Sequence, residues 1–185
     1  MNTISIVGKR YNTRLGRRAL LARDVAAVEC ALVAVNPAVA VLKGGGDVSC
    51  RAGLAAALAR WHAEMAATAR RRGRALGVPA QAGVIVATSA YRPLGTPCAL
   101  GTPFADEGGA LDSHDEWGHW SGWAVDVPTR FTRESFAPVL SVEECWVAAE
   151  RAGLVRPFRS EYWHWRPAAA IVARAKESTL AGVKS

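Results

Sequence analysis

Two short motifs contain the residues of this chain that are best suited to metal chemistry. The first runs from His119 to Asp126 and reads His-x-x-Gly-x-Ala-x-Asp, and the second runs from Glu161 to His164 and reads Glu-x-Trp-His. Histidine is scarce, with 4 in 185 residues. At these residue frequencies, the two motifs are expected by chance on the order of 0.002 and 0.01 times per chain. Finding both in one chain therefore indicates a functional site.

Together the motifs supply two imidazoles and two carboxylates, which is the set of groups that a catalytic zinc ion needs. Such an ion takes three protein ligands and leaves its fourth position to water, whose pKa it lowers toward neutrality. A carboxylate beside that water can accept its proton and return it to a leaving amine. His119 and Asp126 are too far apart for one helix face. We therefore expect Gly122 to let the chain turn, so that a loop histidine meets a strand aspartate.

A third motif lies upstream, at Ser89-Ala90-Tyr91-Arg92-Pro93. In this order the three motifs resemble those of the zinc D-alanyl-D-alanine peptidases of the M15 class. That class holds carboxypeptidases and dipeptidases of peptidoglycan metabolism and vancomycin resistance, and some phage endolysins. The resemblance spans about Val84 to Pro167, nearly half of the chain.

The resemblance implies one Zn²⁺ ion bound by His119, Asp126 and His164. It also implies that Glu161 is the catalytic base. Arg92 would stabilise the developing oxyanion or position a substrate carboxylate.

Further substrate contacts are expected from Ser89, Tyr91 and Trp163. The implied fold is the small α+β fold shared with hedgehog signalling domains. The Glu-x-Trp-His ending favours a D,D-carboxypeptidase or a related endolysin over the L-alanyl-D-glutamate endopeptidases, whose last motif usually reads Asp-x-x-His. The expected partner is a peptidoglycan peptide.

Other interpretations of the same residues remain open. The three proposed ligands could be polar groups that satisfy one another by hydrogen bonds, or they could hold a zinc ion without catalysis. Glu161 could orient a ligand histidine rather than act as a base. Arg92 could brace its loop through an ion pair. We expect His62 to be structural and His114 to be solvated.

The elements that must position these residues follow from periodicity and capping signals. We expect helices over Arg18–Val35, from Asp47 or Ser49 to Leu76, and from Ser141 to about Ala152, and strands over Val84–Thr88, Trp123–Val127 and Tyr162–Trp165. Residues 1–18 read as an arm, 93–118 as a long loop and the end of the chain as an alanine-rich helix. This order predicts one α+β domain over 1–185, with a mainly helical part at 1–80 and a zinc peptidase core at 84–167.

Composition excludes several classes of protein. Half of the residues are apolar, enough for one core, and no apolar run is long enough for a membrane span. We expect no secretory signal, synthesis in the cytoplasm, and action on the cell wall after release or export. The four cysteines are dispersed, so neither a four-thiolate zinc site nor a disulfide framework is predicted. For the oligomeric state, we expect a monomer.

The net charge of +7 favours an anionic partner, for which the cell wall fits better than a specific nucleic acid. A basic cluster at Arg70, Arg71, Arg72 and Arg74 supports a rival hypothesis. In that hypothesis the protein binds the wall or another polyanion through the cluster, and its zinc site is only structural.

Overall fold

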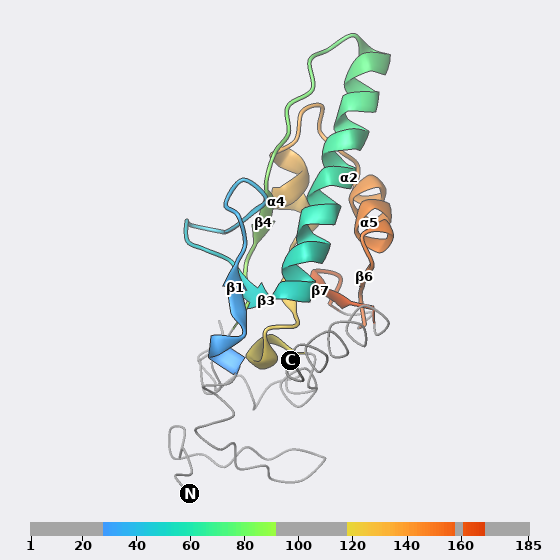
Figure 1. Cartoon of the computed structure of the whole chain (residues 1–185). Coiled ribbons are helices and arrows are strands. Elements are labelled where there is room, and N and C mark those ends of the chain that lie inside the picture. Colours follow the sequence, from blue (N-terminus) through green and yellow to red (C-terminus); the bar gives the residue numbers. More distant parts are fainter. Residues whose placement is uncertain (1–27, 92–117, 158–160, 169–185) are drawn as a thin grey trace, which may run out of the picture.

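The computed structural model describes residues 28–91, 118–157 and 161–168, which form a mixed α and β structure around one long helix (Figure 1). That helix is α2 (Ala52–Leu76), and α5 (Val142–Arg151) packs against it. The shorter α4 (Thr129–Glu134) contacts both α5 and strand β4 (Ile85–Ala87). This mixture is compatible with the predicted α+β class.

The core forms along one face of α2. The spacing of Leu54, Leu58, Trp61 and Met65 predicts a single buried face, and all four side chains are fully buried, which confirms it. The helix ends at Gly77, whose left-handed backbone (φ 66°) brings its N–H to the carbonyl of Arg74. Glycine adopts this conformation without a steric penalty, so the predicted end is correct.

The strands are short and pair in three small sheets. β1 (Leu32–Ala34) pairs antiparallel with β3 (Ser49–Arg51), β2 (Ala40–Leu42) pairs parallel with β4, and the third sheet has the order β5-β7-β6. The members of the third sheet are β5 (Val125–Asp126), β6 (Leu154–Val155) and β7 (His164–Pro167), all antiparallel to their neighbours.

A single bridge connects the exit of β4 to β5. The Thr88 N–H donates to the carbonyl of Asp126, and the Asp126 N–H donates to the carbonyl of Ser89, both at 2.8 Å. The motif that begins at Ser89 is thereby held against the strand that carries Asp126.

Two helix predictions need correction at the amino-terminal side. The expected helix Arg18–Val35 is wrong over its last turn, because Leu32–Ala34 extends to pair with β3; its residues 18–27 lie outside the described part. The helix expected from Asp47 or Ser49 begins only at Ala52, because Ser49–Arg51 is the partner strand. Strand pairing outweighed helical periodicity in both places, so residues 28–80 contain short strands beside the long helix.

The carboxyl-terminal half follows the predictions more closely. The strand expected over Val84–Thr88 is confirmed as β4, and the helix expected from Ser141 is confirmed as α5. The Ser141 hydroxyl accepts the Glu144 N–H while the Glu144 carboxylate accepts the Ser141 N–H. This is the capping box that a serine followed three residues later by a glutamate predicts.

Three details of this half differ from expectation. β5 is shorter than Trp123–Val127, and the last strand begins at His164 instead of Tyr162, because residues 161–164 form a turn in which the His164 N–H donates to the Glu161 carbonyl at 3.0 Å. Helix α4 was not predicted. The expected arm at 1–18, nearly all of the loop at 93–118 and the alanine-rich end lie outside the described residues. Within the three described ranges, no helix is long and apolar enough to cross a membrane.

Candidate metal centre

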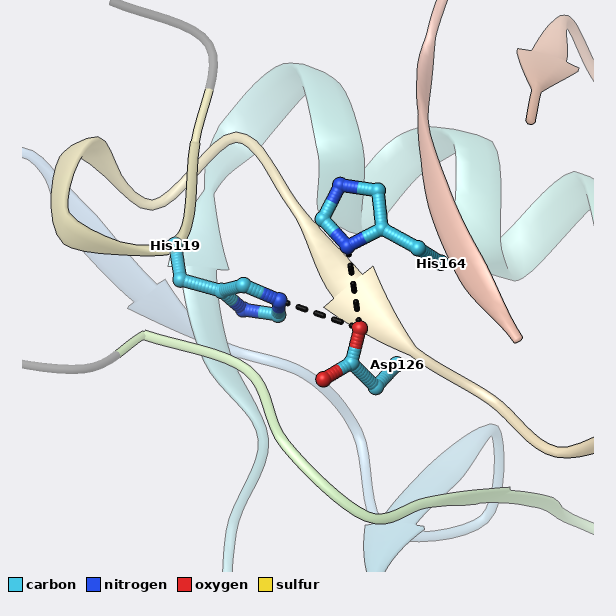
Figure 2. A group of neighbouring side chains, drawn as sticks. All are labelled: His119, Asp126 and His164. Atoms are coloured by element: carbon cyan, nitrogen blue, oxygen red, sulfur yellow. Dashed lines mark hydrogen bonds and ion pairs between the residues drawn. The ribbon is translucent and has the colours of Figure 1, made fainter. Parts of the chain in front are cut away.

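Three predicted ligands come together in the interior. His119, Asp126 and His164 each offer one ligand atom, and these atoms all lie within 4.8 Å of one another (Figure 2). Asp126 Oδ1 is 3.0 Å from His119 Nε2 and 3.0 Å from His164 Nδ1. As whole residues, His119 and His164 are each 1% exposed and Asp126 is 9% exposed, so the group is shielded from bulk water.

His119 is positioned by a tight turn. It begins the short 3₁₀ helix η2 (His119–Ser121), which ends at Gly122 with φ 77°. The predicted turn at Gly122 is thus confirmed, and it directs the chain into β5. Arg51, at the end of β3, anchors the same turn, since its backbone N–H donates to the Gly122 carbonyl and its Nε donates to the Ser121 carbonyl, both at 2.9 Å.

Asp126 and His164 are positioned by strand register. Asp126 lies directly opposite His164 in the β5–β7 ladder, and Val125 lies opposite Trp165. Directly opposed residues in an antiparallel pair have side chains within contact distance. The two motifs, 38 residues apart at these positions, therefore meet because of backbone pairing rather than loop geometry.

The hydrogen bonds of His119 favour a cation between the three groups. Its Nδ1 lies 2.7 Å from the Ala90 carbonyl oxygen, and because a carbonyl only accepts, the ring donates there. A neutral imidazole then presents a lone pair at Nε2, facing the Asp126 carboxylate. The lone pairs of His119 Nε2 and Asp126 Oδ1 repel each other at this distance. Their approach therefore requires either a second proton on the ring or a positive ion between the two atoms.

The spacing and donor chemistry suit a metal ion. Zinc bonds to imidazole nitrogen and carboxylate oxygen at about 2.0–2.2 Å, so tetrahedral geometry places such ligand atoms about 3.3 Å apart. Contacts of 3.0 Å are close to that separation. The bond to the Ala90 carbonyl is the type of outer contact that fixes the tautomer of a ligand histidine. The buried group could therefore hold a metal ion.

Asp126 is ionised in this setting. Burial alone would raise the pKa of its carboxyl group, but the charge and hydrogen bond of His119 and the hydrogen bond of His164 lower it. The net pKa lies well below the ordinary aspartate range. A negative charge that faces two imidazoles suits a divalent cation.

Glu161 and Trp163 lie at the entrance to β7. Glu161 is partly exposed, and its carboxylate is not one of the three clustered ligand groups. Trp163 is partly buried, packs edge-to-face on Tyr162 with ring centroids 4.8 Å apart, and accepts the Val127 N–H through its carbonyl. The Glu161 side chain thus belongs to the turn that precedes a ligand, without joining the ligand set.

The upstream motif reaches the site mainly through its backbone. Ser89 pairs with Asp126, and the Ala90 carbonyl accepts from His119. The Tyr91 hydroxyl instead donates to the Glu29 carboxylate at 3.3 Å. Arg92 lies outside the described residues, as does His114.

Sequence reasoning missed two positioning contacts. The Ala90 carbonyl carries no side-chain signal, since any residue offers the same oxygen. Arg51 lies 70 residues from the carbonyl that its Nε contacts, and neither periodicity nor motif spacing indicates such a contact.

Among the described residues, His62 and three cysteines lie outside the group of candidate ligands. His62 lies within α2, where its Nε2 contacts the Gly83 carbonyl at 2.8 Å and its ring packs against Phe136. These contacts agree with the expected structural role. Cys30, Cys50 and Cys145 are free thiols, and Cys98 lies outside the described residues.

Comparison with known proteins gives no further assignment: no protein-family model, no curated protein and no solved structure matches this chain.

Proposed function

We propose that this protein is a zinc peptidase that hydrolyses the peptide stems of peptidoglycan, of the D-Ala-D-Ala carboxypeptidase or endolysin type. The observation that carries the proposal is the buried His119, Asp126 and His164 group, assembled from a turn and two paired strands with ligand contacts of 3.0 Å. The proposal includes the hedgehog-like peptidase fold, action on the wall after release from the cytoplasm, and a monomeric state.

The choice of zinc rests on donor chemistry. Two imidazole nitrogens and one carboxylate oxygen form a three-ligand set used by catalytic zinc, whereas magnesium and calcium prefer oxygen ligands. A zinc ion bound there supplies Lewis acidity that polarises the scissile carbonyl and lowers the pKa of an attacking water.

The chain's own residues divide the remaining work. Asp126 and the two histidines hold their positions through the ladder and the Ala90 contact. The Glu161 carboxylate accepts a proton from the attacking water and returns it to the leaving amine, a role that needs a carboxylate outside the ligand set. On the basis of the upstream motif, Arg92 stabilises the developing oxyanion or positions the substrate carboxylate.

The decisive variant is Glu161→Gln, with Glu150→Gln on the exposed face of α5 as the matched control. Both variants are loaded with zinc and assayed for metal content and for release of D-alanine from a D-Ala-D-Ala peptide. We expect Glu161→Gln to retain zinc and to lose at least about 100-fold in turnover, since general acid–base catalysis contributes that much. Unchanged turnover in this variant would refute the mechanism.

The bond that is cut is read from the products. Mass spectrometry of muropeptides after digestion separates loss of one D-alanine from loss of a dipeptide, opened cross-links, or cleavage between L-alanine and D-glutamate. The first three products agree with the proposal. The last would assign the chain to the endopeptidase alternative.

A second candidate function rests on the end of α2. Arg70, Arg71 and Arg74 are exposed there, while Arg72 pairs with Glu144 at 2.7 Å. Three exposed arginines on one helix end could bind an anionic wall polymer. Such binding would weaken steeply with salt and would survive Glu161→Gln, so a salt titration of binding to intact walls separates it from catalysis.

A further inference from the structure

A groove between α4 and α5 has the composition of a binding site. It encloses about 680 Å³ and is lined by two arginines, Arg130 and Arg133, by three aromatic rings, Phe131, Trp146 and Tyr162, and by no acidic residue. A smaller groove between α2 and α5 contains three glutamates and two arginines instead. The α4–α5 groove is therefore the more electropositive of the two.

The α4–α5 groove also contains hydrogen-bond donors without acceptors. Arg133 Nε and Trp146 Nε1 are shielded from solvent, and neither finds a hydrogen-bond partner in the structure. A buried donor left in this state costs about 1–3 kcal/mol. Two such donors on one groove indicate that an acceptor group enters it when the groove is filled.

Cationic side chains contact two of the rings that line this groove. Lys43 Nζ lies 4.1 Å from the centre of the Phe131 ring and the Arg130 guanidinium lies 4.6 Å from it. Arg156 lies 3.8 Å from the Trp146 ring. Neither Arg130 nor Arg133 forms an ion pair with any residue in the described ranges, so their charges can act on a ligand.

The groove adjoins the metal centre along the chain. Pro128, on its wall, is two residues beyond Asp126, and Tyr162 is two residues before His164. The Val127 N–H donates to the Trp163 carbonyl at 2.7 Å, which holds these two segments side by side. At about 3.3 Å per extended residue, the wall begins roughly 7 Å along the chain from the ligands. One extended peptide of a few residues can span both.

We propose that the α4–α5 groove binds a carboxylate of the peptide substrate, on residues adjacent to those that occupy the metal centre. This inference rests on the proposed peptidase function. Arginine forks pair closely with carboxylates, and the three rings offer flat faces for the peptide. A phosphate polymer could use the same charges, but a groove of this volume beside the metal centre suits a short peptide better.

Two synthetic peptides test the proposal. The first is L-Ala-γ-D-Glu-L-Lys, which has a free α-carboxylate on its second residue but lacks D-Ala-D-Ala. The second carries an amide in place of that carboxylate. Each is titrated calorimetrically into the zinc-loaded full chain, and mass spectrometry verifies that it stays intact. The proteins are wild type, Arg130→Gln, Arg133→Gln and, as a charge-matched control at the end of α2, Arg74→Gln.

We expect wild type and Arg74→Gln to bind the acid peptide more tightly than the amide. In Arg133→Gln the affinity for the acid should fall about ten- to hundredfold, as for loss of a charge-assisted hydrogen bond, with the amide unchanged. The exposed Arg130→Gln should show a loss in the same direction, which covers the case in which Arg133→Gln fails to fold.

Equal binding of acid and amide by wild type would overturn the groove assignment, as would equal losses in Arg133→Gln and Arg74→Gln. Inorganic polyphosphate is the competitor: if it binds more tightly than the acid peptide and depends on the same arginines, the peptide assignment is wrong. The two proposals fail separately. Hydrolysis of D-Ala-D-Ala without acid preference refutes only the groove, and acid preference without hydrolysis refutes only the peptidase.

Discussion

Asp126→Asn is the substitution that tests the metal centre most directly. It keeps the shape of the side chain but removes the negative charge that faces His119 and His164 at 3.0 Å. Apparent zinc binding free energies of about 10–16 kcal/mol in four-ligand sites correspond to roughly 2.5–4 kcal/mol per ligand. Loss of one anionic ligand should therefore weaken zinc binding by about two to three orders of magnitude.

The expected stability change follows by linkage. At a zinc concentration of 100 times the wild-type Kd, binding stabilises the folded state by about 2.7 kcal/mol. In a chain of 185 residues this corresponds to a rise in Tm of about 5–11 °C. With a Kd raised about 100-fold, the same zinc concentration stabilises Asp126→Asn by only about 0.4 kcal/mol, or roughly 1 °C.

The assay is thermal unfolding with and without zinc, together with zinc affinity from competition with a chromophoric chelator. Because the quantity compared is the zinc-induced shift, any effect of the substitution on metal-free stability cancels. Asp47→Asn, at an exposed aspartate between β2 and β3, is the matched control and should keep the full shift. If Asp126→Asn shows the same shift and affinity as wild type, the metal centre has been assigned to the wrong residues.

Four further substitutions and a labelling experiment test the structure of the site and of the elements that support it. Gly122→Ala should lower the free energy of unfolding by about 1–3 kcal/mol and weaken zinc binding, because its φ is 77° and an added Cβ would lie 2.5 Å from a leucine methyl of β1. Gly77 has a similar φ, but open space surrounds the position of an added Cβ. Denaturant unfolding should therefore show a smaller loss of unfolding free energy for Gly77→Ala than for Gly122→Ala. A larger loss for Gly77→Ala would contradict the close packing at Gly122. Burial raises the pKa of the Cys50 thiol to about 12, so a thiolate-selective reagent at pH 8 should label exposed Cys30 and spare Cys50 in peptide maps. Between pH 9 and 12 the unfolded thiol ionises first, so stability should fall as pH rises, and Cys50→Ala should flatten that slope. Ser141→Ala should cost about 1 kcal/mol through loss of the α5 cap, measured as a Tm lower by about 2–4 °C, and an unchanged Tm would mean that the cap contributes nothing.

Sequence reasoning identified the features that local chemistry controls. The buried face of α2, its end at Gly77, the capping box of α5 and the turn at Gly122 each follow from one residue type in one local pattern. The three residues that meet in the candidate metal centre were also named, from the two motifs and the family resemblance that these motifs carry. Their meeting depends on the register of β5 and β7, which the short strands themselves do not specify.

Long-range pairing explains what the sequence could not provide. Residues 32–34 have a pattern that fits a helix, but Ser49–Arg51 offers them a strand partner. Arg51 anchors the turn of His119 from a distant part of the chain. Strand pairing and side-chain contacts of this kind depend on which distant segments come together, and local sequence patterns do not indicate that.

Because Asp126 and His164 lie opposite each other on two paired strands, metal binding can also show the order in which parts of the chain fold. His119 and Asp126 are 7 residues apart, whereas His164 is 38 residues from Asp126 and Ala90 is 29 from His119. Contacts between distant residues form late because closing long loops costs chain entropy. During refolding, a weak two-ligand complex should precede the complete one, and the rate at which tight metal capture appears should measure the docking of β7 onto β5.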